Sequence, residues 1–446
     1  MKPTAAIAPQ PATDRQPGRL RIALRAFRHR NYRLYFVGQS ISITGTWMQT
    51  IALNWLIYRL TDSPFMLGLI GFVLYAPNFF LAPIAGVFAD RTSRFRIFFT
   101  AQVLSMLQAA TLATLVLTDM IQVWHIIVLS AVQGMINSFD FPSRQSLVIQ
   151  LVDDKSDLAN AIALNSSMVN LARMLGPAFA GILIAAIGEG LCFLFNSISF
   201  IAVLGCLAAM RLRPQEGSSR ESDIWRGFAE GLRYVRHSQS IRTVLALLAF
   251  VSIVGMPYAA IMPVFARDVL HGDSQTLGFL MGMTGVGAIT AAIFLATRRR
   301  VIGLERMLAL ASTLLGSGLI FLSFMREIHL ALPFMYLIGV GMISQIAVTN
   351  TLLQTLVDDD HRGRVISLYV ACFVGMLPFG NLLYGSLASG IGAPGTMLVG
   401  GLLCLLASAA FLTQLRGWRE TAYPILQERA AATASPAIAP AQPNSN

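Results

Sequence analysis

Charged side chains are scarce in this chain of 446 residues, and acids are almost absent from its apolar segments. Asp, Glu, Lys and Arg make up 12% of the residues, whereas soluble domains carry roughly 25%. Of the 22 acids, only Asp140 lies inside a long apolar run, where a carboxylate costs about 2.5–3.5 kcal/mol. So few charges cannot cover a water-exposed surface, which excludes an ordinary soluble domain.

Residues that bind metals or attack substrates are few as well. The four cysteines lie inside apolar runs, where a lone thiol behaves as a small apolar residue, and the six histidines are scattered over connections and run ends. Asp140 has no second acid beside it, and the chain contains no Gly-x-x-x-x-Gly-Lys-Ser/Thr loop. We therefore predict no disulfide, no metal or cofactor site, no enzyme activity and no ATP-driven pump.

Long apolar runs fill most of the sequence. About 20 apolar residues cross a bilayer as a helix, and the runs fall six on each side of a polar stretch. The predicted runs are Phe36–Tyr58, Met66–Ala89, Ile97–Leu117, Trp124–Phe141, Ala161–Ile187, Leu191–Met210, Val244–Val264, Leu277–Ala296, Met307–Phe324, Leu330–Leu353, Ile366–Ala388 and Met397–Leu412. The predicted fold class is an all-α membrane protein with twelve transmembrane helices in two six-helix bundles.

Lys and Arg collect on one side of the predicted membrane. Of the 33, only Arg59, Arg267 and Arg326 fall in the odd-numbered connections, and Arg173 lies inside a run. The other 29 fall in the termini and the even-numbered connections. Because positive charge marks the cytoplasmic side, both termini are predicted to be cytoplasmic. The net charge of +11 therefore reflects topology and contact with anionic lipid rather than nucleic-acid binding.

Composition divides the chain into five segments. Residues 1–18 are predicted to be a disordered tail without the apolar core of a signal peptide. Two bundles, 19–212 and 241–415, flank a cytoplasmic linker at 213–240, and 416–446 form a C-terminal tail. In the linker, apolar residues recur at helical spacing, which predicts an amphipathic helix on the membrane surface. They are Ile224, Phe228, Leu232 and Val235.

A short motif occurs at the same place in each half. Leu-Val-Asp-Asp follows the fourth run, ending at Asp154, and the tenth run, ending at Asp359. A parallel repeat of two six-helix bundles is a known plan for transporters, with the substrate path between the halves. The repeat therefore favours a transporter with its pathway at the interface of the halves.

The second connection gathers a glycine, an acid and several bases at the end of a run. It reads Gly86-Val-Phe-Ala-Asp90-Arg91-Thr-Ser-Arg94-Phe-Arg96. With the two sets of six runs, it resembles the signature loop of the major facilitator superfamily, Gly-x-Leu-x-Asp-Arg-x-Gly-Arg-Arg, with departures at Phe88, Ser93 and Phe95. The resemblance implies that Asp90 caps or pairs with a second-half helix in the outward-facing state, and that Arg94 bridges to an acid on the fourth run, Asp140. Without the resemblance, the loop is an ordinary basic connection on the cytoplasmic side.

Asp140 has a local partner in Arg144, four residues along the same helix. Pro142 lies between them and is expected to kink the helix. A carboxylate shared between Arg94 and Arg144 would change its proton affinity when either base moved away, as proton coupling requires. Two interpretations stay open, a proton-coupling group and a purely structural latch.

The fifth run resembles the antiporter motif of superfamily exporters, which centres on Gly-Pro in this helix. The run carries Asn170, Arg173, Gly176, Pro177 and Gly181, and the motif's earlier glycines are missing. The resemblance favours export over uptake. Arg173, the only base deep in a run, either pairs with a distant group for stability or faces the cavity and attracts an anionic substrate.

Other polar residues inside runs are candidates for the substrate cavity, although helix packing explains each of them equally well. In the first run, small and polar residues form one stripe that ends at Gln49, next to Trp47. Asn350 and Asn381 occupy the tenth and eleventh runs. The first run carries no acid, unlike that of many drug exporters of the superfamily.

Three strings narrow the resemblance to one bacterial branch of the superfamily. They are Phe27-Arg-His-Arg-Asn31-Tyr-Arg-Leu, Phe141-Pro-Ser-Arg144-Gln145-Ser-Leu and Arg362-Gly363-Arg364-Val-Ile-Ser-Leu. They resemble the branch that contains the enterobactin exporter and related siderophore and macrolide exporters. The resemblance implies an inner-membrane protein that expels a medium-sized amphipathic molecule in exchange for protons, and we expect it to be a monomer. A nutrient uptake permease of the same fold, a non-transporting sensor and a membrane enzyme are the alternatives.

Overall fold

The computed structural model describes residues 24–152, 154–211, 224–298 and 302–434, and every regular element in these ranges is helical. The first half contains η1 (Arg25–Arg28), α2 (Arg30–Thr61), α3 (Pro64–Arg91), α4 (Arg94–Leu117), α5 (Val123–Gln150), η2 (Lys155–Asp157), α6 (Leu158–Ile187) and α7 (Glu189–Ala208). The second half contains α8 (Ile224–His237), α9 (Gln239–Val254), η3 (Met256–Ile261), α10 (Met262–Val264), η4 (Phe265–Val269), α11 (Ser274–Thr297), α12 (Leu304–Phe324), α13 (Ile328–Leu356), α14 (Asp359–Phe373) and α15 (Leu377–Ala434).

The predicted apolar runs fall on helices, because a helix satisfies its own backbone polar groups in lipid. In the described residues, 9 helical segments are long and apolar enough to cross a membrane. The more polar α2 and α5 are not among them. The last segment, Asp360–Arg429, is 70 residues long and contains the non-helical residue Gly392, at φ 73°. The all-α membrane fold is confirmed, and the number of twelve crossings stays a prediction.

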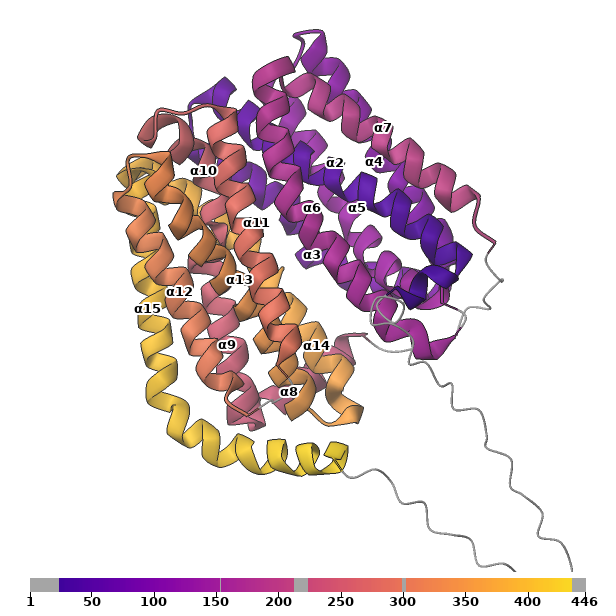
Figure 1. Cartoon of the computed structure of the whole chain (residues 1–446), viewed down its shortest axis with the longest axis vertical. Coiled ribbons are helices and arrows are strands. Elements are labelled where there is room, and N and C mark those ends of the chain that lie inside the picture. The colour runs from indigo at the N-terminus through magenta and orange to yellow at the C-terminus, as the bar shows by residue number, and fades with distance from the viewer. Residues whose placement is uncertain (1–23, 153, 212–223, 299–301, 435–446) are drawn as a thin grey trace, which may run out of the picture.

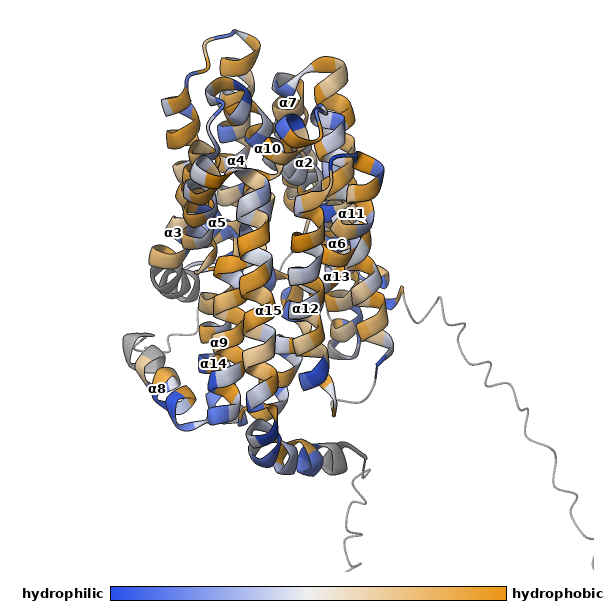
Figure 2. Ribbon diagram, turned by 90° about the vertical axis from the view of Figure 1, so that its left-hand side faces the viewer, coloured by the Kyte–Doolittle hydropathy of each residue, from blue (hydrophilic) through white to orange (hydrophobic). Residues whose placement is uncertain are grey.

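The outer surface is apolar, the reverse of a soluble protein. Phe80, Ile293 and Leu406 are each more than 60% exposed, and many other large apolar side chains are exposed as well. Figure 2 shows hydrophobic residues along the outer faces of the helices and hydrophilic ones near their ends and on α8. Such a surface is stable only against lipid.

The first and second halves form two groups of helices that lie side by side (Figure 1). Between the halves, α6 packs against α11 and α3 packs against α15, while α2 contacts α10 and α3 contacts η3. The amphipathic helix predicted in the linker is α8, which packs against α14 and α9. We call the end of the molecule that carries α8 the linker end. Both ends of the described chain lie there, because Ala26 donates to Asn160 at the start of α6 and α15 finishes beneath α8.

The first crossing of the second half is a broken helix. The sequence predicts one run, Val244–Val264, but α9 ends at Val254 and is followed by the short elements η3, α10 and η4. Pro257 and Pro263 lie in η3 and α10, and each removes a backbone donor from the helical ladder. This broken segment lies at the end opposite α8, beside α2 and α3.

The helix α15 continues past 415, where the sequence predicts a tail. Its last turns bend across the linker end (Figure 1), and Trp418, Ala422 and Leu426 are buried there. The Trp418 indole donates to the Ser240 carbonyl oxygen at 3.0 Å. The carboxylate of Glu305, whose side chain is fully covered, accepts hydrogen bonds from Arg419 and Tyr423. Residues 416–429 therefore pack against the second half. The helix itself continues to 434, and 435–446 of the predicted tail lie outside the described residues.

A covered carboxylate also fixes the start of the chain. Asp157 accepts hydrogen bonds from Arg28 at 2.7 Å and from His29 at 3.2 Å, and its side chain has no exposed surface. The Arg28 guanidinium holds the pKa of the Asp157 carboxyl below its usual range, and His29 lowers it to a smaller extent. The segment before α2 is thereby attached to the start of α6. The predicted tail at 1–18 lies outside the described residues.

Candidate functional site

The two principal helix pairs that join the halves pack through glycine. In the pair α6 and α11, a Cβ added at Gly181 would lie 2.9 Å from Gly278 Cα. In the pair α3 and α15, a Cβ added at Gly68 would lie 2.5 Å from the Asn381 carbonyl oxygen and 2.8 Å from Gly385 Cα. Real Cβ atoms do not approach closer than 3.0 Å, so only glycine lets these backbones touch. We call these two pairs the glycine seams.

Both seams lie toward the end opposite α8. Gly181 is near the last turn of α6, and its carbonyl oxygen accepts from the hydroxyl of Ser274, the first residue of α11, at 3.2 Å. Gly68 is near the first turn of α3. Because α6 begins at the linker end, these positions place the contacts of Gly181 and Gly68 toward the opposite end, and the seam between α6 and α11 continues to Met174 and Gly285 near the middle of both helices.

Two polar contacts between the halves lie at that same end. The Arg267 guanidinium of η4 contacts the Asp62 carboxylate after α2 at 2.6 Å. The Tyr58 hydroxyl of α2 donates to the Asp268 carboxylate. Arg267 is one of the three bases of the odd-numbered connections, and a second, Arg59, pairs with Glu189 at 2.8 Å. These two exceptions to the charge asymmetry therefore have acid partners.

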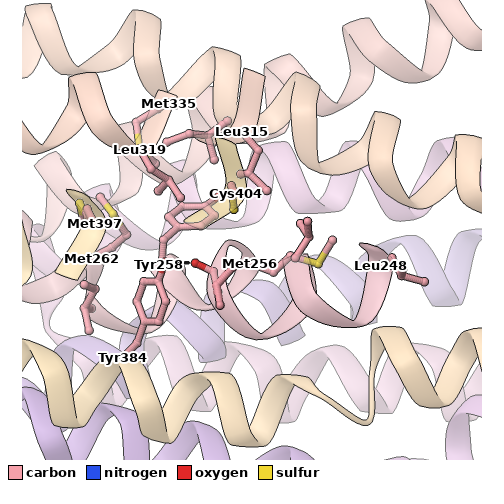
Figure 3. Close-up of a cluster of buried hydrophobic side chains, with 14 of the residues drawn as sticks. Leu248, Met256, Tyr258, Met262, Leu315, Leu319, Met335, Tyr384, Met397 and Cys404 are labelled. Carbon is pink, nitrogen blue, oxygen red and sulfur yellow. Dashed lines mark hydrogen bonds between the residues drawn. The ribbon is translucent and has the colours of Figure 1, made fainter. Parts of the chain in front are cut away.

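Arg173 lies half-buried on α6 without an acid partner among the described residues. Its Nε and Nη1 atoms are buried and make no hydrogen bond. The guanidinium carbon lies 5.3 Å from the ring centroid of Trp47 on α2. Tyr75 of α3 and Tyr258 of η3 lie within electrostatic range of the guanidinium. Arg173 therefore lies against one aromatic ring, with a tyrosine of each half in its wider surroundings, and Figure 3 shows Tyr258 among buried apolar side chains beside Tyr384.

The other residues of the predicted antiporter motif position this arginine. A Cβ at Gly176 would lie 2.5 Å from Trp47 Cβ, so Gly176 lets α2 and α6 approach one turn away from Arg173. Pro177 is accommodated inside α6, and Gly181 lies in the glycine seam. Asn170 is half-buried one turn before Arg173. The motif thus lines the faces of α6 that meet α2 and α11.

Gln49 faces the interior of the first half. Its amide donates to Gln108 Oε1 at 3.0 Å and accepts from Asn196 Nδ2 at 2.7 Å. All three amides are buried. Of the candidate cavity residues, Gln49 is thus occupied in an internal network of α2, α4 and α7, whereas Trp47 lies beside Arg173.

The second-half candidates separate in the structure. Asn381 is 6% exposed, and its side chain lies against Gly71 in the seam between α3 and α15. Asn350 is half-buried on α13 and accepts from Gln354, one turn further along, at 3.1 Å. The structure therefore places neither residue beside Arg173.

Asp140 lies in the second half of α5 and contacts two side chains. It accepts from Gln102 Nε2 of α4 at 2.7 Å and lies 3.7 Å from Arg144 Nε. The helix continues through Pro142. Arg94 is half-buried at the start of α4 and makes no ion pair with Asp140 in this conformation. Asp140 is therefore paired with Arg144, its neighbour on the same helix, and not with Arg94, the partner implied by the signature loop.

The remaining signature-loop residues cannot be compared in the same way. Gly86, Asp90 and Arg91 lie at the end of α3, where only the backbone belongs to the described part of the structure. Their predicted gating role therefore stays a prediction.

The sequence reasoning missed several residues at the interface of the halves. Tyr75 and Tyr258 were overlooked because aromatic residues are common in every run. Several interface glycines could have been predicted from the sequence, because small residues three or four apart mark close helix contacts. They are the glycines at 68, 71, 278, 282 and 285.

An all-helical chain with a lipid-facing surface and two halves joined mainly through glycine seams is a multi-pass membrane transporter. Residues 22–432 match the family of transmembrane secretion effectors of the major facilitator superfamily, and the chain belongs to this family. It is a secondary transporter of the efflux type in a bacterial inner membrane, and not an enzyme.

Named relatives cover nearly the whole chain. The staphyloferrin A transporter of Staphylococcus aureus is 27% identical over 85% of this chain and 95% of its own length. The multidrug efflux pump Tap of Mycolicibacterium fortuitum is 23% identical over 83% and 93%. The macrolide efflux protein A of Streptococcus pyogenes is 21% identical over 87% and 98%.

Solved transporters share the fold. A peptide transporter POT in complex with sulfate matches with a TM-score of 0.70 at 12% identity, over 88% of this chain and 95% of its own. A bacterial homologue of the lysosomal transporter Spinster, in an inward-facing and unoccupied conformation, matches with a TM-score of 0.64 at 14% identity, over 93% and 99%. At these identities the likeness shows the fold alone.

Proposed function

We propose that this protein exports a medium-sized amphipathic molecule, such as a siderophore or drug-like compound, by alternating access in exchange for protons. Two six-helix bundles, 19–212 and 241–415, would rock about the substrate path between them, joined by the linker 213–240. Both termini would be cytoplasmic, and a monomer embedded in lipid would suffice. The efflux functions in the names of the relatives support export over nutrient uptake.

The position of the glycine seams is the observation that carries this proposal. The basic residues of the termini and the even-numbered connections identify the linker end as cytoplasmic. The glycine seams run from the opposite end, which would be periplasmic, to the middle of α6 and α11. This placement supports an inward-facing state. From that state, a rocking motion would open the seams and form the gating contacts of Asp90 and Arg94 at the cytoplasmic end.

Asp140 is the group we propose for proton coupling. It is held by Gln102 and Arg144 in this state. Approach of Arg94 in the opposite state would stabilise the charged carboxylate, and its departure would favour proton uptake. The proposed gating set is Gly86, Asp90, Arg91, Arg94, Asp140 and Arg144.

Proton movement in inverted membrane vesicles tests the proposal. Vesicles are energised by a pH gradient and challenged with siderophores, macrolides and lipophilic cations. We expect substrate-evoked proton movement in the wild type, its loss in Asp140→Asn, and normal movement in Asp119→Asn, an exposed acid of the same half. Movement that persists in Asp140→Asn would reduce Asp140 to a structural latch. No response to any compound would contradict the proposed class of cargo.

A further inference from the structure

We infer that Arg173 and its aromatic neighbours Trp47, Tyr75 and Tyr258 bind a carboxylate-bearing group of the transported molecule, with an apolar part of the cargo against the rings. This inference rests on the proposed function, because it places the cargo between the halves. It adds the chemical class of the cargo and the residues that select it.

The first argument is the unmet charge of Arg173. Among the described residues it has no acid partner, and two of its three guanidinium nitrogens are buried without a hydrogen bond. Arginine cannot relieve this state by losing its proton. A buried cation without partners is strongly unfavourable, so such a residue persists where a ligand supplies the partner.

The second argument is the chemistry of the surrounding side chains. Trp47 offers its ring face to the guanidinium at 5.3 Å, and the two tyrosines add neutral phenol groups. Cation–π contact lowers the energy of the cation but leaves the N–H donors unused. The planar guanidinium fork matches a carboxylate in two-point geometry. The rings then favour an apolar or planar part beside that carboxylate.

The third argument is the position of Arg173 between moving parts. Met174, its neighbour on α6, packs so closely against Gly285 of α11 that no Cβ would fit there. Trp47 belongs to α2 and Tyr258 to η3, so the surroundings of Arg173 include both halves. A ligand held here would contact both halves in the inward-facing state and lose part of these contacts when the halves rock.

Ligand binding to the purified full-length protein tests the inference without requiring transport. The probes are naphthalene-2-carboxylate and the neutral naphthalene-2-carboxamide, which share size and ring but differ in charge. We expect the wild type to bind the carboxylate about tenfold or more tightly than the amide, as expected for charge-assisted hydrogen bonds. Arg173→Gln should remove this preference, and Arg173→Lys should retain only part of it.

Stability without ligand separates recognition from a structural role. The cost of burying an unpaired guanidinium exceeds what one cation–π contact returns, so Arg173→Gln should melt at the same temperature as the wild type or higher. Arg59→Gln is the matched control, because Arg59 is paired with Glu189. It should lower the melting temperature and leave the carboxylate preference unchanged.

Two results would overturn the inference. One is equal binding of carboxylate and amide by the wild type. The other is a clear loss of ligand-free stability in Arg173→Gln together with an unchanged preference. Either could occur while vesicles still show substrate-evoked proton movement, so the proposed function would be judged separately.

Discussion

Gly181 and Gly278 face each other across the two halves of the protein. A Cβ added at Gly181 would lie 2.9 Å from Gly278 Cα, and one added at Gly278 would lie 2.8 Å from Gly181 Cα. The backbones of α6 and α11 therefore touch directly, with no side chain between them. The proposed inward-facing state would depend on this contact and on its counterpart between α3 and α15.

A larger side chain at this contact should force the periplasmic ends of the halves apart. We expect Gly181→Val to shift the population toward an outward-open arrangement, with about 1–3 kcal/mol lost from the closed contact. Spin labels on cysteines introduced at Asp119 and Glu327, exposed sites on the two halves, would report a longer distance. Gly205→Val is the control, because a Cβ there meets nothing within 4 Å. Unchanged distances in Gly181→Val would contradict the role of the seams.

The buried amide network should contribute to stability rather than to substrate selection. Gln49→Leu would leave Asn196 Nδ2 and Gln108 Oε1 without their partner in the interior, at a cost of about 1–3 kcal/mol each. We expect a lower melting temperature and unchanged relative binding of different substrates. Thr46→Ala, on an exposed face of the same helix, should have little effect. An altered substrate preference with normal stability would return Gln49 to the substrate pathway.

The docked end of α15 should depend on Glu305. In Glu305→Gln, the covered carboxylate that accepts from Arg419 and Tyr423 loses its charge, which weakens both hydrogen bonds. We expect faster tryptic cleavage after Arg416, Arg419 and Arg429. Glu420→Gln is the control, since Glu420 is exposed and pairs only with Arg416 on the same helix. Equal cleavage rates in the two variants would show that other contacts, such as those of Trp418 and Arg429, hold the segment.

Stability should fall in acid through Asp157. Its folded pKa is lowered, chiefly by Arg28, so its contribution is present above the unfolded value of about 3.9 and is lost as the pH falls through the folded pKa. Asp157→Asn should be less stable at neutral pH and should lose less further stability below about pH 4 than the wild type. Melting temperatures measured from pH 3 to pH 7 check this, with Asp119→Asn as a control that should follow the wild type.

Features that depend on nearby residues could be predicted from the sequence. The apolar runs, the amphipathic helix in the linker and the Asp140–Arg144 pair all follow from spacing along one helix. The packed end of α15 could also have been predicted from the spacing of its apolar residues. Its buried Trp418, Ala422 and Leu426 recur every four residues, but their polar neighbours suggested a tail.

Features that depend on distant residues could not be predicted. A polar stripe on α2 does not reveal whether Gln49 meets Asn196 in its own half or a ligand between the halves. Asn381 likewise looked available for substrate and is used in packing against Gly71. The aromatic surroundings of Arg173 come from three separate elements. Only the assembled helices determine such partners.

The glycine seams also determine how the closed end can yield. Dispersion between touching backbones falls off steeply, and a gap of 0.5–1 Å already forfeits roughly a quarter to a half of it. A contact of this kind resists small displacements and is lost over a short further separation, rather than weakening gradually. A partly open protein would have neither the seam contacts nor the contacts at the linker end. Such states would be sparsely populated, which would limit leakage through the protein.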